Sequence, residues 1–590
     1  MNNLLPTTKE EASARGWNEL DIIIVTGDAY VDHPSYGAAI IGRVLEAEGF
    51  RVGIIAQPDL KKPHDLQRLG RPRLFFGVTA GNLDSMLANY TANKKFRSED
   101  EYSPGGKRGF RPDRATLIYT NNIKQAFDNM PVVIGGMEAS MRRLAHYDYW
   151  SDTVRRSILL DSKADILVYG MGETQVVEIA KRLKSGENIK NLNNISGTVV
   201  ARNSIDAFPD ALSIPSFEEV ALDRGKFNEA FKLSYMEQDP VRGRAIIQPH
   251  AGRFVIQLPP AKPLPTKEMD RIYGLPFTRK PHPSYKKAGG VPGLETVKFS
   301  ILSHRGCPGE CSFCSLYAHQ GRIVQSRSAS SILREIEHIA SQPDFTGSIT
   351  DIGGPTANLY RAGCELWETK GACKGRRCLV PEKCNSLKLG YAQTLELWKQ
   401  AGMIPRVKHI FVGSGIRYDL LNSEESDKYF KELCENHISG QLKVAPEHTR
   451  THVLKLMRKS AFRAYEEFVE RFEAVNKKIR KKQFLVNYFI VAHPGTTLED
   501  AVSMALQLKD MGIYPEQIQD YIPLPMTASA AMYYTERDPF TGQGVYVAKN
   551  LRERKLQRAL VQFKNPDNKR YVIEALTKLN KTALMKDFYN

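Results

Sequence analysis

Short apolar runs alternate with amphipathic stretches along the first 205 residues. Residues 21–25 (D-I-I-I-V) and 51–56 (R-V-G-I-I-A) are typical of buried strands, and residues 37–48 place their apolar side chains on one helical face. Further strands are predicted at 74–81, 131–140 and 164–173. Strands that alternate with helices predict an α/β domain with an open, Rossmann-like parallel sheet. Such sheets bind ligands at the carboxyl ends of their strands.

The periodicity weakens between residues 206 and 289, where two stretches, 257–266 and 274–285, are rich in proline. We therefore expect an extended linker there. From residue 290 to 535 the alternation returns and predicts a second, parallel β/α domain. Its six strands are expected at 297–302, 347–354, 407–415, 441–448, 484–491 and 517–523. Residues 536–590 form a C-terminal extension, with helices expected at 551–564 and 571–579.

The bulk composition is that of a cytoplasmic globular protein. The chain has 590 residues, 42% hydrophobic and 25% charged, which predicts several domains. No apolar stretch reaches the ~18 residues of a membrane span, and the N-terminus lacks the core of a signal peptide.

The formal net charge is +17, and the basic residues are dispersed. Their densest run, Lys477 to Lys482, ends an amphipathic helix, where cations interact favourably with the helix dipole. A solvated helix end explains this run, and the overall charge leaves a nucleic-acid partner open.

Three cysteines lie close together between His304 and Tyr317, in H-R-G-C-P-G-E-C-S-F-C-S-L-Y. Cys307, Cys311 and Cys314 have C-x3-C-x2-C spacing, which lets one loop turn three thiolates toward one point. Three thiolates can hold three irons of a [4Fe-4S] cluster and leave the fourth iron open. The alternatives are unrelated buried cysteines or three of four zinc ligands, although zinc sites favour paired C-x2-C spacing.

This motif resembles the signature of the radical S-adenosylmethionine (radical SAM) enzymes. The resemblance implies a partial (β/α)6 barrel in which SAM binds the open iron and is cleaved reductively to a 5′-deoxyadenosyl radical. That radical would abstract hydrogen from a substrate that the sequence does not identify. The resemblance further implies that Phe313 lies beside the adenine. It also places Gly353 and Gly354 at the SAM amino group, although Pro355 stands where the family often has an acidic residue. Ser414 and Arg417 would lie at the ribose or the carboxylate of SAM.

A second cysteine set lies in an insertion at residues 360–386. Its four members occur within twenty-one residues and predict a metal-bound loop, either zinc or an auxiliary iron–sulfur cluster. Free or redox-active thiols are the alternative. The four are Cys364, Cys373, Cys378 and Cys384.

The N-terminal pattern resembles the domain of cobalamin-dependent radical SAM enzymes, whose ligand motif is D-x-H-x-x-G. Here Asp32 and His33 are adjacent and Gly37 lies four residues further on, so cobalamin is not expected. Residues 492–500 (A-H-P-G-T-T-L-E-D) resemble a turn of the methylthiotransferase branch, and Thr497 to Asp500 also fits a helix cap.

The order of these features resembles that of the YgiQ-type radical SAM proteins over nearly the whole chain. The resemblance implies an electron donor such as flavodoxin or ferredoxin and names no substrate. Two alternatives remain at this point: a radical SAM enzyme that modifies RNA bases, and a non-catalytic iron–sulfur or zinc protein that senses redox state.

Overall fold

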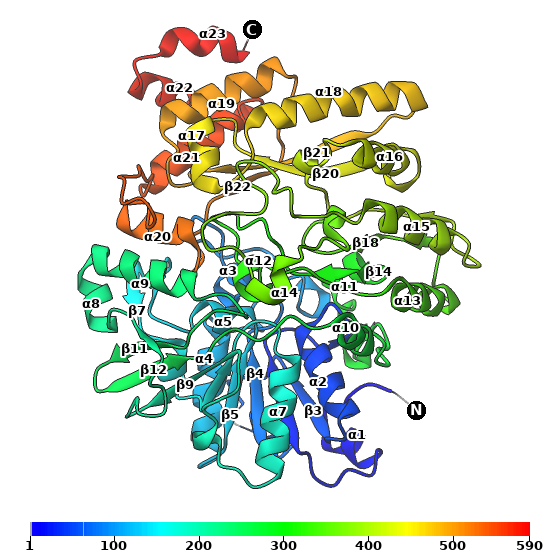
Figure 1. Cartoon of the computed structure of the whole chain (residues 1–590), viewed down its shortest axis with the longest axis vertical. Helices are drawn as coiled ribbons and strands as arrows, with labels where there is room; N and C mark the ends of the chain where they lie inside the picture. The colour runs from blue at the N-terminus through cyan, green and yellow to red at the C-terminus, as the bar shows by residue number, and fades with distance from the viewer. Residues whose placement is uncertain (1–2, 63, 590) are drawn as a thin grey trace.

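A nine-stranded sheet forms the centre of the N-terminal domain in the computed structural model, which describes residues 3–62 and 64–589 (Figure 1). Its strand order is β10-β11-β12-β9-β8-β5-β4-β1-β3, and the five strands from β8 to β3 are parallel. The strands are β1 (Ile22–Thr26), β3 (Val52–Ala56), β4 (Phe75–Thr79), β5 (Val132–Gly135), β8 (Ile166–Val168), β9 (Thr198–Arg202), β10 (Leu212–Ser213), β11 (Ile246–His250) and β12 (Arg253–Gln257).

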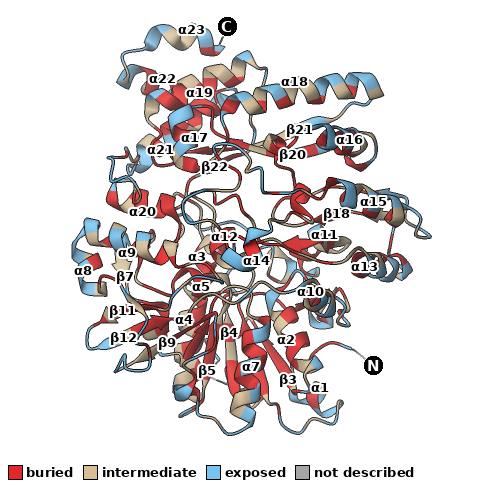
Figure 2. Ribbon diagram, viewed as in Figure 1, coloured by how far each residue is buried: buried red, intermediate tan, exposed pale blue. Residues whose placement is uncertain are grey.

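Helices cover both faces of this sheet, which explains why all five residues of β1 are buried and its first four are apolar. Successive side chains of a strand point to opposite faces. Ile22 and Ile24 therefore pack with Val44 of α2 (Gly37–Ala47), whereas Ile23 and Val25 pack with Tyr119 of α4 (Ala115–Ala126). Figure 2 shows the buried residues running along the central strands. The other helices of the domain are α1 (Lys9–Ser13), α3 (Ser85–Asn89), α5 (Gly136–Met141), α6 (Ile158–Asp161) and α7 (Glu173–Lys184).

The predicted linker at 206–289 is wrong, because most of this segment is folded. It supplies β10, β11 and β12 to the sheet, where β12 pairs antiparallel with β9. The prolines misled the prediction: Pro259 to Pro265 follow β12 and form only a short extended stretch. The apolar β12 nevertheless completes a sheet hydrogen-bond ladder. The segment also holds α8 (Phe217–Leu222), α9 (Arg224–Met236), α10 (Thr266–Tyr273) and β13 (Lys280–Pro281).

All six strands predicted for the second domain are present and pair in parallel. The second strand divides at Thr350, and an isolated bridge between Ile416 and Val444 joins the third to the fourth. Within the described residues β14 and β22 do not pair, so the barrel is open. The strands are β14 (Ser300–Leu302), β17 (Ser348–Ile349), β18 (Asp351–Gly353), β19 (His409–Ile410), β20 (Gln441–Glu447), β21 (Phe484–Val491) and β22 (Ile518–Asp520).

Helices alternate with these strands, as the sequence pattern predicted. They are α11 (Pro292–Val297), α13 (Ala329–Ser341), α15 (Tyr391–Gly402), α16 (Glu424–Glu432), α17 (Thr451–Met457), α18 (Phe462–Ile479) and α19 (Leu498–Asp510). Thr497 caps α19, because its hydroxyl accepts from the Asp500 N–H while the Asp500 carboxylate accepts from the Thr497 N–H. A capping box thus accounts for the turn that resembled the methylthiotransferases.

The C-terminal extension packs against α19 through an apolar cluster of its own, which includes Leu556, Leu560 and Leu576. Both predicted helices are present there. The helices of the extension are α21 (Leu551–Val561), α22 (Lys569–Lys578) and α23 (Met585–Tyr589), and α20 (Ala528–Thr535) precedes it. None of the described helices combines the length and the apolar character that crossing a membrane requires.

Candidate active site

The three-cysteine loop lies at the carboxyl end of the first barrel strand. It runs between two short antiparallel strands, β15 (His304–Arg305) and β16 (Gln325–Ser326), and includes α12 (Leu316–Gln320). The Cys307 N–H donates to the Gly321 carbonyl at 3.1 Å, and the Cys314 N–H donates to the Cys311 carbonyl at 3.0 Å. These bonds fold the loop so that all three partly exposed thiols belong to one compact turn.

Among the described residues, no three His, Cys, Asp or Glu side chains converge on one metal ion. This arrangement is compatible with a cubane cluster, because each thiolate binds a different iron and the sulfurs need not meet.

The backbone conformation at the start of this loop requires a glycine at position 306. Its φ is +83°, and a Cβ there would lie 2.1 Å from the Ile323 carbonyl oxygen. We expect Gly306→Ala to cost about 1–3 kcal/mol of stability, since backbone strain and a main-chain overlap add together. Iron content after anaerobic reconstitution and thermal melting measure the effect. Gly402→Ala, at the end of α15, is the control, because its added Cβ would meet no atom within 4 Å beyond its own neighbours in the helix, and it belongs to neither cysteine set. Equal melting temperatures and iron contents in the two variants would contradict this explanation.

Segments distant in the sequence hold the middle of the loop. The Ser312 N–H donates to the Met457 carbonyl at 3.0 Å, and the Ser312 hydroxyl accepts from Ser529 of α20 at 2.7 Å. The Ser529 hydroxyl also lies 2.7 Å from His493 Nε2. The Phe313 ring stacks edge to face on His493 at 6.1 Å. Residues of the barrel domain itself, in α17, after β21 and in α20, therefore hold the cysteine loop in place.

Glu310, between the first two cysteines, is a second anchor that sequence reasoning missed. Its φ is +47°, and its buried carboxylate accepts hydrogen bonds from the Tyr235 hydroxyl and, at 3.1 Å, from Arg322. Arg458 donates to the same Tyr235 hydroxyl at 2.8 Å. Tyr235 belongs to α9, inside the segment that we had predicted to be a linker, so no local pattern could reveal this contact.

Charged side chains line the barrel beside the thiols. Arg417 Nη1 lies 4.0 Å from Cys311 Sγ, and the guanidinium is ion-paired with Asp419. Glu447, at the end of β20, is buried, and burial raises the pKa of its carboxyl group. Burial raises the pKa of Cys307 to about 11, and the charge of the neighbouring Cys311 is a second, smaller cause. The same two causes raise the pKa of Cys314. A cation beside these sulfurs favours their thiolate form.

The two glycines after the second strand are explained by close packing. A Cβ on Gly353 would lie 2.2 Å from Ser414 Oγ, and one on Gly354 would lie 2.5 Å from the His304 ring. Ser414 donates both its N–H and its hydroxyl to Asp351 Oδ1, each at 3.2 Å. The carboxyl ends of the second and third strands therefore meet, as the barrel prediction required. Asp351, which makes this contact, was not singled out in the sequence.

The four cysteines of the insertion lie next to the three-cysteine loop. Cys364, Cys378 and Cys384 pack with Cys307 against one apolar cluster that includes Trp367 of α14 (Leu366–Lys370). The pKa of Cys378 rises to about 12 through burial, then through the charges of Glu310 and of the other three cysteines. The four thiols are thus neighbours, although no three of them surround one ion position in the described residues.

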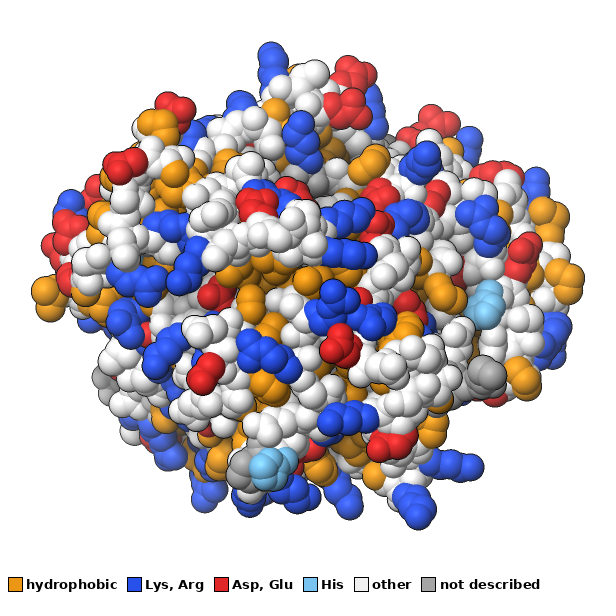
Figure 3. All heavy atoms as spheres, turned by 90° about the horizontal axis from the view of Figure 1, so that it is seen from below, with side chains coloured by type: hydrophobic (Ala, Val, Ile, Leu, Met, Phe, Trp, Pro, Cys, Tyr) orange, Lys and Arg blue, Asp and Glu red, His pale blue; other side chains and the backbone are white. Residues whose placement is uncertain are grey.

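Two stretches that contain several basic and aromatic residues, 93–114 and 139–150, are partly buried. Arg142 is ion-paired with Asp84, and Tyr147 packs against Tyr534. Arg111, near the end of the long polar loop 93–114, is also buried. Figure 3 views the end of the molecule formed by the N-terminal domain, where lysines and arginines are spread among acidic and apolar side chains. The positive charge therefore marks no single groove on this face.

Three family models match this chain. They are Radical SAM N-terminal over residues 4–300, Radical SAM superfamily over residues 301–508, and Domain of unknown function (DUF3362) over residues 516–586. The first matches the nine-stranded domain together with the segment mistaken for a linker.

Two curated relatives match nearly the whole chain. A UPF0313 protein of Methanosarcina acetivorans is 51% identical over 609 residues, covering 99% of this chain and 82% of its own. One from Methanocella arvoryzae is 51% identical over 578 residues, covering 98% of this chain and 96% of its own.

The cobalamin-dependent S-adenosylmethionine radical enzyme OxsB, solved with aqua-cobalamin and S-adenosylmethionine bound, has a similar fold. Its TM-score is 0.50 at 9% identity, over 92% of this chain and 66% of that one. The relatives and the family models together confirm the resemblance to YgiQ-type proteins: the chain belongs to the UPF0313 family and is a radical SAM enzyme.

Proposed function

We propose that Cys307, Cys311 and Cys314 hold a [4Fe-4S] cluster whose fourth iron binds SAM. The observation that supports this most is their position: three partly exposed cysteines share one loop at the carboxyl ends of the strands of a six-stranded parallel barrel. Active-site residues of β/α barrels lie at this end. When bound, such a cluster supplies the electron that cleaves SAM to methionine and a 5′-deoxyadenosyl radical.

The surrounding side chains orient SAM and exclude water. Arg417, near Cys311, is the residue that we propose for the SAM carboxylate, and we propose that the buried Glu447 accepts from the SAM amino group. Gly353 and Gly354 have no side chain of their own and remain the proposed backbone contacts of the SAM amino group, although the Ser414 hydroxyl and the His304 ring lie against them. Ser414 is the residue proposed for the ribose. Phe313 remains the proposed neighbour of the adenine.

An anaerobic assay for 5′-deoxyadenosine tests this function. Reconstituted protein with dithionite and SAM should form deoxyadenosine and methionine, and omission of either reagent should abolish both products. Protein that carries a full cluster but forms neither product would contradict the proposal. Flavodoxin or ferredoxin is the electron donor that we propose for the cell.

We further propose that Cys364, Cys373, Cys378 and Cys384 bind a second metal centre, either zinc or iron–sulfur. Their mutual proximity supports it, as does their contact with the cluster loop. Iron and zinc analysis of Cys378→Ala against wild type should reveal the loss of one zinc or of several irons per chain. Unchanged contents of both metals would contradict this second site.

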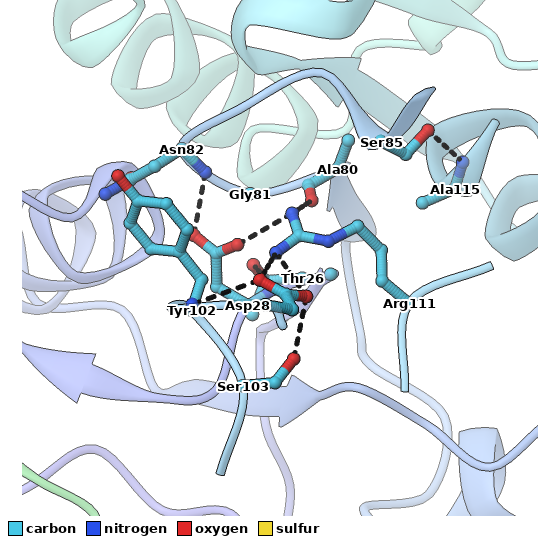
Figure 4. Close-up of polar contacts among 12 residues, drawn as sticks. Thr26, Asp28, Ala80, Gly81, Asn82, Ser85, Tyr102, Ser103, Arg111 and Ala115 are labelled. Atoms are coloured by element: carbon cyan, nitrogen blue, oxygen red, sulfur yellow. Dashed lines mark hydrogen bonds and ion pairs between the residues drawn. The ribbon is translucent and has the colours of Figure 1, made fainter. Parts of the chain in front are cut away.

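OxsB was solved with aqua-cobalamin bound, which removes support from the expectation that this chain binds none, so the residues at the corresponding sheet end must decide. In Figure 4 the carboxyl ends of β1 and β4 are occupied by an ion-paired cluster. Arg111 contacts Asp28 at 2.8 Å and Asp100 at 3.2 Å, and all three are buried. A Cβ on Gly81 would overlap Asp28.

A cavity that lies between the sheet and the cysteine loop is too small to hold a corrinoid. The cavity there measures about 80 Å³, whereas pockets for drug-sized ligands, which are smaller than cobalamin, span roughly 300–1,000 Å³. His33 is fully buried and accepts from the Ser35 N–H at 3.0 Å. We therefore propose a cobalamin-free N-terminal domain and derive no step through that cofactor.

Titration with hydroxocobalamin tests this proposal. We expect the corrinoid to pass through gel filtration separately from the protein, because the cluster around Arg111 fills the sheet end. Retention of one equivalent of cobalamin per chain, with the altered absorption spectrum of a bound corrinoid, would show that these residues move aside and would contradict the proposal.

A further inference from the structure

A cavity of about 80 Å³ lies where the N-terminal sheet meets the cysteine loop. One wall is the carboxyl end of β8, at Tyr169 and Gly170, and the opposite wall is α12, which begins two residues after Cys314. Thr174 and Lys262 are exposed at its rim. A water molecule occupies about 30 Å³ of liquid, so the cavity holds a group of a few heavy atoms.

Arg143 brings to this cavity a positive charge that no carboxylate balances, and its guanidinium lies over the Tyr169 ring at 4.6 Å from the ring centroid. It is fully buried, and among the described residues it forms no ion pair with a carboxylate. Nε donates to Gln257 and Nη1 to the Ser140 carbonyl, both at 2.6 Å, whereas Nη2 has no partner. The nearby Arg305, by contrast, is ion-paired with Glu173. A buried charge without a counterion is costly, so a site of this kind favours an anion.

The rest of the lining favours an anion as well. It contains no aspartate or glutamate, and its three cations are Arg143, Lys262 and Arg322, of which Arg322 is paired with Glu310. Two more buried donor atoms on this cavity, the Tyr317 hydroxyl and Gln238 Nε2, have no hydrogen-bond partner. Buried polar atoms are nearly always paired in folded proteins, so three unpartnered donors around one cavity indicate a missing acceptor.

His319 on α12 supplies a neutral neighbour. Its Nδ1 lies 3.1 Å from Ser140 Oγ, and burial, then the charges of Arg143 and Arg305, lowers its pKa to about 4. The imidazole is therefore uncharged at neutral pH and adds no second buried cation.

We propose that this cavity binds an oxyanion, a carboxylate or phosphate group of a small molecule, through Arg143 Nη2, Tyr317 Oη and Gln238 Nε2. Ligands of open α/β sheets bind at the carboxyl ends of strands, and here that end also contacts the helix after the cysteine loop. The site is separate from the proposed SAM site and does not depend on it.

Calorimetric titration of the full-length reconstituted protein with sodium phosphate and with sodium acetate, at matched ionic strength, tests the proposal. We expect at least one of the two to bind saturably, and the stronger one identifies the group as phosphate or carboxylate. Arg143→Gln should weaken binding by about tenfold or more, because a charge-assisted hydrogen bond is lost. Arg253→Gln, an exposed arginine of β12, should leave it unchanged.

Tyr317→Phe provides a second test that does not depend on the folding of the arginine variant. Its hydroxyl has no partner within the protein, so the variant should fold normally and bind the anion several-fold more weakly. Soaking crystals of the protein in sodium selenate should place an anomalous peak beside Arg143 Nη2. Absence of saturable binding for both anions would overturn the proposal, as would equal affinities in wild type, Arg143→Gln and Tyr317→Phe.

Discussion

Cys311→Ala is expected to reduce the formation of 5′-deoxyadenosine to the background of the assay. Removing one of three thiolates leaves two protein ligands for four irons, so the cluster should be lost or unable to bind SAM productively. Iron content should fall by about four atoms per chain. The assay is anaerobic SAM cleavage with dithionite, together with iron analysis of the same reconstituted sample.

Cys434→Ala is the matched control for this experiment. Cys434 is fully buried among apolar residues, including Leu433, and belongs to neither cysteine set. We expect this variant to retain its iron and its SAM cleavage, with at most a modest loss of stability from the smaller side chain. If both variants cleaved SAM at the wild-type rate, the cluster would not depend on this loop.

Glu173→Gln is expected to lower the free energy of unfolding by about 3–5 kcal/mol, because it leaves a buried arginine without its counterion. Glu173 begins α7 and lies 2.6 Å from Arg305 in β15, and both side chains are at most 2% exposed. This ion pair joins the N-terminal domain to the strand that leads into the cysteine loop. Urea denaturation followed by circular dichroism measures the change.

The control for the buried pair is a surface pair. Glu467→Gln removes the partner of Arg463 on α18, where the two side chains are 62% and 85% exposed. Exposed pairs contribute about 0–1 kcal/mol, so this variant should unfold at nearly the wild-type urea concentration. A Glu173→Gln protein as stable as Glu467→Gln would show that the domains are not held together through Arg305.

Local sequence patterns predicted the elements of this fold well. The six barrel strands were found because each is a short apolar run and most of them alternate with amphipathic helices. The cluster loop was found because its cysteine spacing is independent of tertiary structure. The prediction of a linker at 206–289 was wrong because it, too, relied on a local pattern. Its prolines are a local signal, whereas the pairing of β12 with β9 is a contact between distant residues.

Most residues that support the site could not be predicted from the sequence. Tyr235 reaches Glu310 across 75 positions, and Glu173 reaches Arg305 across a domain boundary. No periodicity or spacing encodes such contacts, because they arise only when two separately folded units pack together. Asp351 is similar, since its role depends on where the third strand ends beside the second.

The electron paramagnetic resonance spectrum of the reduced, reconstituted protein tests the central claim most directly. It should be recorded with and without SAM, in the Cys378→Ala variant so that the second cysteine set does not contribute. A three-cysteine cluster with an open iron should give a [4Fe-4S] signal whose g values change when SAM binds. A cluster signal that SAM leaves unchanged, or one that persists in Cys311→Ala, would contradict it.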